Sequence, residues 1–412
     1  VQEANIDLDK KMQVFIGTQA SGKSTICKVI YFCQKIRDYT LDFLMDGEQY
    51  FENHQNEYFN LYMKYLTKQF MGCFGKTTHM QKFKIVYSFE EKHIEITLNK
   101  DGYIRFKFDN TLKDKLIDFI NEAAGMFLQE LNSEKIYSII DNITAVALMK
   151  QQFRERLYKL FENNAEIIYI PAGRSLLATM SEQLHDFSIS DMDLTMQEFI
   201  NLIRNTKTKF GSKIPDIVKN YTKTVKGQIN NNSLEVAYGL IKEIFKADYM
   251  NESDGEKIYF DDRHWVKLMY GSSGQQEKKS FVIIEEPEAH LFPIAQRKVI
   301  DLISLMLNST ESKTIITTHS PYILTSLNIL LYSDKVEHGL KGKMIIPRNM
   351  RINYNSFGAY KVGNDENCTG SMHSLLDEQS HMISTDYIDE VSSVINSELE
   401  QLLNKETYRN DM

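Results

Sequence analysis

The hydrophobic and polar residues of this chain alternate between strand-like and helix-like patterns. An apolar run at 12–16 predicts a buried strand, and apolar residues three and four apart from Ile26 to Cys33 predict the helix that follows. The stretch 41–80 is rich in Tyr, Phe, Gln and Asn and is expected to be mostly helical. From Phe83 to Phe108 the pattern changes to strict alternation with an Asp-Gly pair before its last segment, which predicts an antiparallel ribbon of three strands.

The second half of the chain continues this succession of helices and strands. The predicted elements, in order, are helices at 112–131 and 143–162, a strand at 167–170, a helical region at about 176–248, a hairpin of 257–260 with 265–268, a strand at 281–284, a helix at about 293–307 and a strand at 314–317. Strands that alternate with helices favour an α/β fold with a mainly parallel core sheet. An antiparallel β-ribbon arm and an inserted helical lobe interrupt this sheet.

A last helical pattern occupies 386–404, where apolar side chains recur on one stripe. The members of this stripe are Ile388, Val391, Ile395, Leu399 and Leu402. Such a stripe either covers the core of its own protein or binds a partner, and the first interpretation is the commoner one.

Composition places the chain among globular proteins. Of its 412 residues 42% are hydrophobic and 25% are charged, and no run reaches the roughly 18 apolar residues that a membrane helix needs. The net charge of −8 argues against a protein coated in nucleic acid, and the four cysteines show no disulfide framework. The chain begins with Val1 and shows no secretory signal. We therefore expect a cytoplasmic protein with no membrane partner, whose natural start lies upstream of Val1.

The candidate chemistry begins directly after the first predicted strand. Residues 17–25 read Gly-Thr-Gln-Ala-Ser-Gly-Lys-Ser-Thr and fit the phosphate-binding loop pattern G-x-x-x-x-G-K-[ST] in full, in the strand, loop and helix order that the motif requires. The two glycines let backbone N–H groups face phosphate oxygens, the lysine adds a positive charge, and Ser24 is a ligand for Mg²⁺. The residues expected to contact the nucleotide are Gly17, Ser21, Gly22, Lys23, Ser24 and Thr25.

Two adjacent carboxylates end the apolar strand predicted at 281–284. A phosphate-loop enzyme needs a carboxylate at such a strand end to hold Mg²⁺ beside the loop serine, so Glu285 is assigned to the metal together with Ser24. Glu286 is then available as the base that polarises the attacking water. The competing interpretation, two solvated acids, is disfavoured because the phosphate loop is present.

A polar cluster that contains His319 follows the strand predicted at 314–317. In a parallel sheet this cluster lies at the carboxyl edge, where open α/β sheets bind their ligands. We expect His319 to sense the γ-phosphate of the nucleotide, although an isolated histidine is more often a packed or surface residue.

Together these motifs resemble those of the ABC-type ATPases, in particular the SMC-like and OLD-like branch. Gly17–Thr25 matches the Walker A motif, Phe281–Glu286 matches Walker B, and His319 matches the switch histidine. The segment Ser272-Ser-Gly-Gln-Gln276 resembles the signature loop of the family. Two further segments, Glu285-Glu-Pro-Glu-Ala-His-Leu-Phe-Pro293 and Ile170-Pro-Ala-Gly-Arg174, resemble the OLD-like ATPases.

The resemblance implies a P-loop ATPase head that binds ATP and Mg²⁺. It also implies a homodimer or higher homo-oligomer in which two heads sandwich ATP, so that Ser273, Gly274 and Gln275 of one copy act in trans on the nucleotide of the other. Arg174 stands where the family leaves its core sheet, and it is expected either to reach the nucleotide or to pair with an acid.

The sequence departs from the family pattern in three places. Glu285 replaces the aspartate of the transporters, and the signature loop reads Ser-Ser-Gly-Gln in place of Leu-Ser-Gly-Gly-Gln. Only Glu277, Lys278, Lys279 and Ser280 separate this loop from the Walker B strand, where the family has a helix whose positive end helps to hold the γ-phosphate. Either the protein lacks this helix or a segment is missing between Gln276 and Ser280, and we favour a missing segment.

These motifs predict a division of the chain into four parts. They are an ATPase core of 1–40 with 165–175 and 280–345, a β-ribbon and helical arm at 41–164, a helical lobe at 176–279 that ends in the signature loop, and a C-terminal extension at 346–412. Seven basic residues and one acid lie between Arg204 and Gln228 in the lobe. This run is either a solvated helical face or a nucleic-acid surface at 204–228, and the solvated face is favoured.

The resemblance favours an ATP-hydrolysing switch, like the stand-alone OLD-like ATPases of bacterial defence systems that act with a separate effector nuclease or toxin. The alternatives are a DNA-associated SMC- or OLD-like ATPase of repair or nuclease complexes, a chain with its own TOPRIM nuclease, a transporter subunit, and an ATP-binding scaffold with little turnover. No Asp-x-Asp follows a strand pattern after His319, which disfavours the TOPRIM nuclease. The long spacing between Lys23 and Glu285 disfavours the transporter.

Overall fold

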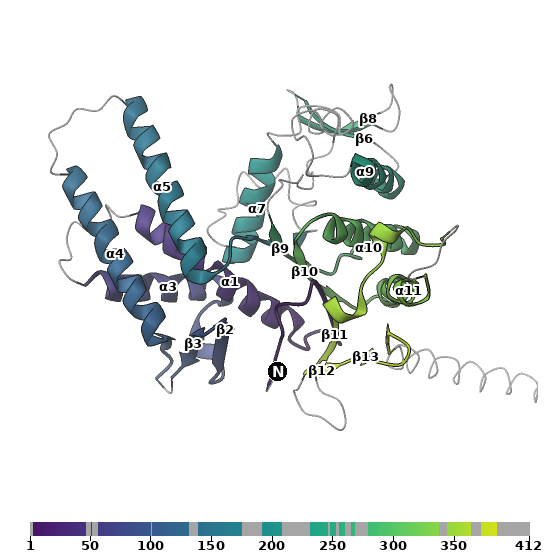
Figure 1. Cartoon of the computed structure of the whole chain (residues 1–412), viewed down its shortest axis with the longest axis horizontal. Helices are drawn as coiled ribbons and strands as arrows, with labels where there is room; N and C mark the ends of the chain where they lie inside the picture. The colour runs from purple at the N-terminus through teal and green to yellow at the C-terminus, as the bar shows by residue number, and fades with distance from the viewer. Residues whose placement is uncertain are drawn as a thin grey trace, which may run out of the picture. The chain divides into compact units, whose positions relative to one another are not determined.

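The chain forms two compact units in the computed structural model (Figure 1). Unit 1 comprises Val1–Ser24, Ile170–Ser181 and Leu202–Met412, and unit 2 comprises Thr25–Tyr169 and Glu182–Asn201. The structure describes residues 3–46, 51, 57–99, 101–131, 139–174, 192–207, 231–245, 248–252, 255–259, 265–267, 279–337, 344–363 and 372–384. No helix in these ranges is long and apolar enough to cross a membrane.

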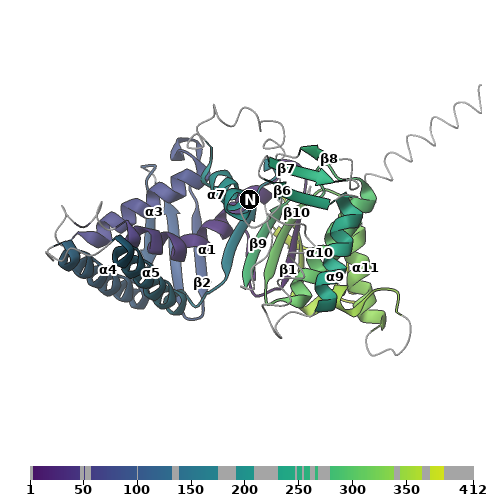
Figure 2. The same ribbon diagram turned by 90° about the horizontal axis from the view of Figure 1, so that it is seen from above.

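A six-stranded sheet of order β12-β11-β1-β10-β9-β5 forms the framework of unit 1 (Figure 2). Its four central strands are parallel: β11 (Phe357–Val362), β1 (Met12–Ile16), β10 (Lys313–Thr318) and β9 (Ser280–Glu285). Strand β12 (Met372–Ser374) pairs antiparallel with β11. Strand β5 (Glu166–Ile170), of which only Ile170 belongs to unit 1, ends the order on the other side. The predicted mainly parallel α/β sheet is therefore confirmed.

Strand β11 is the one central strand that the sequence analysis did not predict. It pairs with β1 so that Phe357 lies opposite Met12 and Lys361 lies opposite Ile16. Gly358 and Lys361 interrupt its apolar pattern, so the local sequence carries only a weak strand signal. Its position beside β1 comes from a pairing between distant parts of the chain, which no local pattern encodes.

Three helices lie side by side on one face of this sheet (Figure 2): α9 (Asn231–Phe245), α10 (Pro293–Ser309) and α11 (Pro321–Glu337). Met12, Val14 and Ile16 occupy alternate positions of β1 and share one hydrophobic core with buried residues of these helices. Burying each such side chain contributes about 1.5–3 kcal/mol to the free energy of unfolding.

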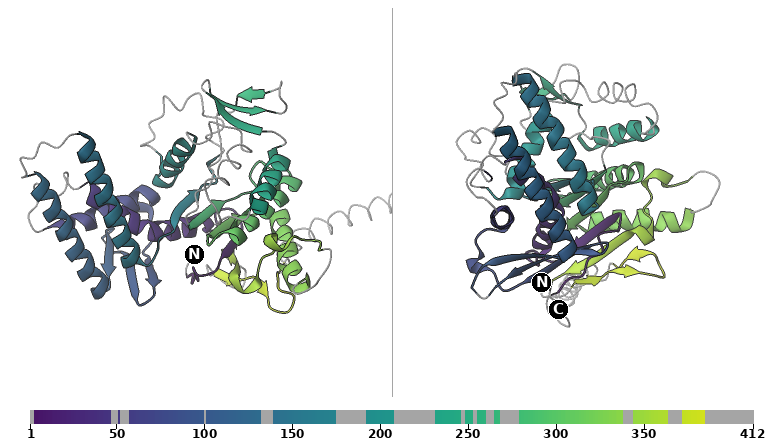
Figure 3. Two further views of the ribbon diagram at one scale, coloured as in Figure 1. Left: turned by 45° about the horizontal axis from the view of Figure 1, so that its top comes forward. Right: turned by 60° about the vertical axis from the view of Figure 1, so that its left-hand side comes forward.

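Two small antiparallel sheets complete unit 1 (Figure 3). One contains β6 (Asp248–Glu252), β7 (Gly255–Tyr259) and β8 (Trp265–Lys267), which confirms the predicted hairpin and adds a strand to it. The other pairs β13 (Leu376–Asp377) with β14 (Met382–Ile383). Two short 3₁₀ turns, η3 (Arg348–Met350) and η4 (Tyr354–Ser356), precede β11.

Unit 2 combines long helices with an antiparallel ribbon. Its helices are α1 (Lys23–Met45), whose first two residues belong to unit 1, α3 (Tyr58–Phe74), α4 (Asn110–Leu131), α5 (Ile139–Phe161) and α7 (Leu194–Lys207), whose residues from Leu202 on belong to unit 1. A 3₁₀ turn, η1 (Thr77–His79), follows α3. The ribbon consists of β2 (Lys84–Phe89), β3 (Lys92–Leu98) and β4 (Ile104–Phe108), which confirms the prediction from alternation. Helices α4 and α5 lie side by side (Figure 3).

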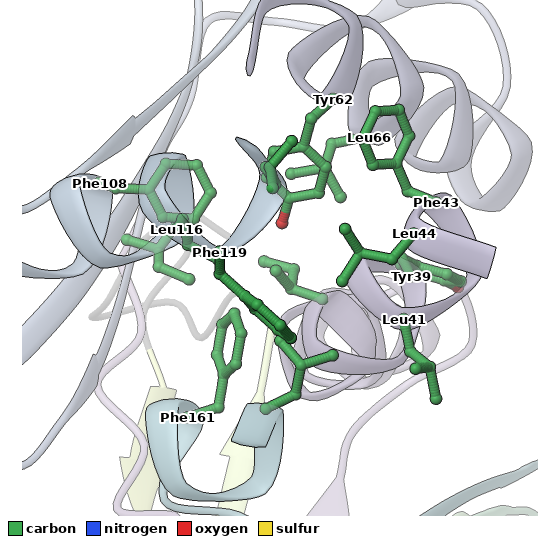
Figure 4. Packing of buried hydrophobic residues seen from close by; sticks show 14 of the residues in the cluster. Tyr39, Leu41, Phe43, Leu44, Tyr62, Leu66, Phe108, Leu116, Phe119 and Phe161 are labelled. Atoms are coloured by element: carbon green, nitrogen blue, oxygen red, sulfur yellow. The ribbon is translucent and has the colours of Figure 1, made fainter. Parts of the chain in front are cut away.

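Aromatic side chains dominate the core of unit 2 (Figure 4). The rings of Phe43 and Tyr62 lie 5.4 Å apart. Those of Phe119 and Phe153 meet edge to face at 5.3 Å. The buried Tyr62 hydroxyl is 2.6 Å from Thr40 Oγ1, so its polar end is satisfied, and burial raises the pKa of Tyr62. The Tyr- and Phe-rich composition of 41–80 is therefore explained by packing between α1, α3 and the ribbon.

Several predicted features lie outside the described residues. They are the C-terminal stripe at 386–404, most of the basic run between Arg204 and Gln228, and the signature loop with Ser273, Gly274 and Gln275.

Candidate functional site

Residues 17–22 join the end of β1 to the start of α1, as the phosphate-loop motif requires. Ala20 and Gly22 have left-handed backbone conformations, with φ of +61° and +103°, which turn the chain sharply. Ser24 and Thr25 are exposed in the first turn of α1, where unpaired N–H groups and the positive end of the helix dipole favour an anion. This loop therefore has the backbone shape and position of a phosphate cradle.

Lys23 is buried in this loop although it carries a charge. Its Nζ donates to the carbonyl oxygens of Gly17 at 2.8 Å and Thr18 at 2.9 Å, and it lies 3.4 Å from Ser21 Oγ. These bonds compensate the removal of the ammonium group from water. The charge is thus held inside the loop, where the motif uses it.

The carboxyl end of β11 packs closely against the same loop. A Cβ atom on Gly17 would lie 2.1 Å from the carbonyl oxygen of Val362, so the approach of two backbones requires glycine at position 17. Gly363 has a φ of +124°, and a Cβ there would lie 2.9 Å from Ser21 Cβ. Val362 and Gly363 could not be predicted from the sequence, because their role depends on the pairing of β11 with β1.

The strand register brings the other candidate residues to the edge of the sheet where the loop lies. Ile16 pairs with Thr318, and Thr317 pairs with Glu285. Strand β10 lies between β1 and β9, and neighbouring strands are about 4.8 Å apart. The structure thus places these residues at the carboxyl edge: His319 is one strand away from β1, and Glu285 and Glu286 are two strands away.

Glu286 has a strained backbone conformation, with a φ of +46°. Its N–H donates to the Thr317 carbonyl oxygen at 2.9 Å and to Thr317 Oγ1 at 3.2 Å, which holds the turn. Its Oε1 lies 3.2 Å from Nε2 of His319, and both side chains are more than a third exposed. Left-handed non-glycine residues cluster at functional sites because the surrounding structure must enforce them. The carboxylate and the imidazole therefore form a fixed pair that solvent can reach.

Glu285, in contrast, is buried and only 4% exposed. Its Oε2 accepts the N–H of Ala172 at 2.9 Å, and its Oε1 has no hydrogen-bond partner among the described residues. A buried carboxylate oxygen is costly unless a cation or a water molecule reaches it. This oxygen suits the predicted Mg²⁺ ligand, with the Ser24 hydroxyl as the second protein ligand that the motif implies.

Arg174 binds the main chain of the turn that carries the two acids. Its guanidinium donates to the carbonyl oxygens of Glu285 at 2.6 Å and Glu286 at 2.5 Å. Burial lowers the pKa of Arg174, whereas the carboxylates of Glu288, Glu286 and Glu285 raise it, and arginine stays charged at neutral pH. These hydrogen bonds go to backbone carbonyl oxygens, so the two predicted roles, contact with the nucleotide and pairing with an acid, both stay predictions.

Glu288 is a functional candidate to which the sequence analysis gave no role. Its Oε1 accepts the Thr318 hydroxyl at 2.7 Å and the backbone N–H of His319 at 2.9 Å. These bonds tie the turn after β9 to the turn after β10 and so orient the histidine. The sequence shows Glu288 as the third acid of the Glu-Glu-Pro-Glu segment. Its hydrogen-bond partners cannot be predicted from this pattern, because they depend on the pairing of β9 with β10.

The residues after His319 begin helix α11. Ser320 Oγ accepts the N–H groups of Tyr322 at 3.2 Å and Ile323 at 3.4 Å, and Pro321 is the first helical residue. Serine at the N-cap and proline at the first position are both preferred at helix starts. This cap fixes the direction in which the chain leaves the site.

The comparisons with known proteins identify a family and a set of structural relatives. Residues 1–324 match a family model described as an AAA ATPase domain, and no curated protein matches the sequence. Similar solved structures include an Smc head bound to the C-winged helix domain of ScpA, at 10% identity and a TM-score of 0.35, covering 91% of this chain and 93% of that chain. An Smc head with an extended coiled coil, bound to the C-terminal domain of ScpA from Pyrococcus furiosus, is 14% identical, with 94% of each chain covered and a TM-score of 0.31. The SMC head domain from Thermotoga maritima is 11% identical, with 89% and 91% covered and a TM-score of 0.29.

The family match covers more than half of the chain and includes the phosphate loop, both acids and His319.

Proposed function

We propose a function for this chain from one premise: the chain belongs to the AAA ATPase domain family. The proposed function is that of a Mg²⁺-dependent ATPase which binds and hydrolyses ATP at the carboxyl edge of the sheet in unit 1. The observation that carries the proposal is the position of the Glu286–His319 pair on strands of the same sheet as the Lys23 loop.

In this proposal the phosphates bind the loop at 17–25. The backbone N–H groups of the loop and the start of α1 donate to phosphate oxygens, and Lys23 exchanges its bonds with loop carbonyl oxygens for bonds with phosphate. Ser24 and Glu285 are the residues that would hold Mg²⁺. When bound, this ion neutralises charge that develops on the phosphates.

The chemical step is assigned to the exposed pair. Glu286 orients and polarises the attacking water, and His319 contacts the γ-phosphate from the neighbouring strand end. Arg174 and Glu288 act through other residues: Arg174 holds the backbone of the two acids, and Glu288 holds the N–H of His319.

The Glu286→Gln and Lys23→Ala variants test these roles separately. We expect Glu286→Gln to bind ATP as the wild type does but to lose on the order of 10²–10⁴-fold in turnover, the usual contribution of a general base. We expect Lys23→Ala to lose ATP binding. Glu311→Gln is the matched control, since Glu311 is exposed at the amino end of β10, away from the site. Wild-type turnover in Glu286→Gln would exclude Glu286 as the base.

The biological role proposed for this activity is that of a regulatory switch. The OLD-like Glu285–Pro293 segment and the loop at 272–276 support a head that dimerises around ATP, with Ser273, Gly274 and Gln275 acting in trans. By the same resemblance, we propose a bacterial defence ATPase that acts with a separate effector protein, a nuclease or a toxin. Purification from the native host with identification of co-purifying proteins tests the effector. Size measurement of Glu286→Gln with and without ATP tests the dimer, and an ATP-independent monomer would contradict it.

A further inference from the structure

Helix α11 carries an apolar stripe on its outer side as well as a buried inner face. Ile323, Leu327 and Leu330 lie in the core, yet four large apolar side chains on the other side are substantially exposed. They are Tyr322 at 53%, Ile329 at 45%, Tyr332 at 47% and Val336 at 49%. Their spacings of seven, three and four residues place them on one side of the helix.

This stripe is too long and too regular to be a set of isolated surface residues. From Tyr322 to Val336 it extends over about 21 Å, at roughly 1.5 Å per residue. Ile345 is 88% exposed, and its N–H donates to Glu337 Oε1 at 2.8 Å, so more apolar surface lies at the end of the helix. A single exposed apolar side chain needs no explanation, whereas several that gather on one side of a helix are typical of an interaction site.

The described chain ends beside this helix. Strand β14 is fixed to the middle of α11 by two bonds between Asn328 and Ile383: the Ile383 N–H donates to Asn328 Oδ1 at 2.7 Å, and Asn328 Nδ2 donates to the Ile383 carbonyl oxygen at 3.0 Å. The last described residue of the chain, Ser384, follows directly. The described chain therefore ends one residue after a partner of Asn328, which precedes Ile329 in the sequence and lies at the level of the midpoint of the exposed stripe.

The sequence of this terminal segment has the complementary pattern. Its apolar positions run from Ile388 to Leu402, the same number of residues as the stripe on α11, and so predict a helical stripe of about the same 21 Å. The link from Ser384 to Ile388 reaches up to about 14 Å when extended, which is enough to bring the segment onto α11. We propose that residues 385–412 form an amphipathic helix that binds the exposed stripe of α11 in the same chain.

Attachment to the same chain favours this occupant over a second copy. A segment on a short linker has an effective concentration in the millimolar range at its site, above the concentration of a second copy at ordinary protein concentrations. A tethered contact is therefore independent of protein concentration, whereas a contact between copies is not. The dependence of the contact on protein concentration therefore distinguishes a segment of the same chain from a second copy.

A disulfide between the midpoints of the two stripes tests the proposal in the full chain. Ile329→Cys and Ile395→Cys are combined with Cys368→Ser, since the other three cysteines are buried. The midpoints meet whichever way the segment runs along α11. With a thiol oxidant added at a fixed concentration to accept the two electrons, we expect an intrachain disulfide that forms at an unchanged rate when the protein is diluted about tenfold. The matched control replaces Ile395→Cys by Ser397→Cys, because position 397 lies across the predicted helix and its Cβ is too far away for a disulfide.

A second pair of variants separates a specific contact from random collision. Leu399→Asp in the cross-linking protein is expected to reduce the disulfide yield to that of the control, and Ser393→Asp on the polar side is expected to leave it unchanged. An interchain disulfide that slows in proportion to dilution would assign the surface to a second copy and overturn the proposal. Equal yields in the test and control pairs would exclude docking altogether.

Discussion

Substitution of Gly363 by alanine tests whether strand β11 shapes the phosphate loop. Gly363 follows β11 and lies so near Ser21 that an added Cβ would overlap it, although the two residues are far apart in the sequence. The substitution adds one methyl group and leaves every predicted nucleotide contact in place. Any effect on ATP binding must then be transmitted through the position of the loop.

The magnitude follows from two terms. A φ of +124° is unfavourable for alanine, and residues in such regions cost on the order of 1–3 kcal/mol. The new Cβ would lie 2.9 Å from Ser21 Cβ, and overpacking of this kind costs typically about 1–3 kcal/mol. If the loop moves away to relieve the overlap with Ser21, ATP binding has to return the loop to its wild-type position. The free energy of ATP binding is then reduced by the cost of this overlap. The Kd for ATP then rises roughly 5- to 150-fold, since 1.4 kcal/mol corresponds to a factor of ten.

The assay is titration of ATP into both Gly363→Ala and a control, with urea unfolding of each. Gly102→Ala is the control: Gly102 also has a positive φ, of +78°, but its Cβ would come no closer than 4.0 Å to Thr77 Oγ1, far from the loop in sequence. We expect both variants to lose stability and only Gly363→Ala to bind ATP more weakly. Wild-type ATP affinity in a destabilised Gly363→Ala protein would refute the reasoning.

Two further predictions concern single carboxylates. Glu288→Ala removes the acceptor of the buried Thr318 hydroxyl, so it should lower the free energy of unfolding by roughly 1.5–3 kcal/mol and should also lower turnover. Glu288→Gln keeps an acceptor and should keep most of the activity, and normal turnover in the alanine variant would contradict the positioning role. Asp109 caps α4. Desolvation raises the pKa of Asp109, but hydrogen bonds from backbone N–H groups outweigh desolvation, and the pKa in the folded protein is lowered overall. The stabilisation from Asp109 is therefore present above the unfolded pKa of about 3.9 and is lost as the pH falls through the lower folded pKa. In urea unfolding, Asp109→Ala should therefore lower the free energy of unfolding by about 1 kcal/mol at pH 7 and by progressively less below about pH 4. Asp114→Ala, on the exposed face of α4, should change this free energy little at either pH. A loss in Asp109→Ala that persists unchanged in acid would contradict the assignment.

The local pattern of the sequence was sufficient for most elements. Alternation over 83–108 predicted the β2–β4 ribbon, and the apolar runs at 12–16, 281–284 and 314–317 predicted three of the four parallel strands. Each of these signals is a periodicity that solvent exposure imposes within a few residues. Strand β11 escaped prediction because a glycine and a lysine interrupt its run and because its stability comes from β1.

By itself, the sequence determined the chemistry that this protein has available: a phosphate loop with Lys23, two acids after one strand and a histidine after another. Tertiary structure alone decided how these groups are held. The register of β9 and β10 places Glu288 where it accepts the N–H of His319. The close approach of β11 to the loop requires glycine at positions 17 and 363. Arg174 donates to the backbone of the acids. The physical reason is that residue type and spacing specify charge, hydrogen-bonding capacity and local conformation. Partners distant in the chain are specified only when strands pair and the core closes, because distances between them are set by packing.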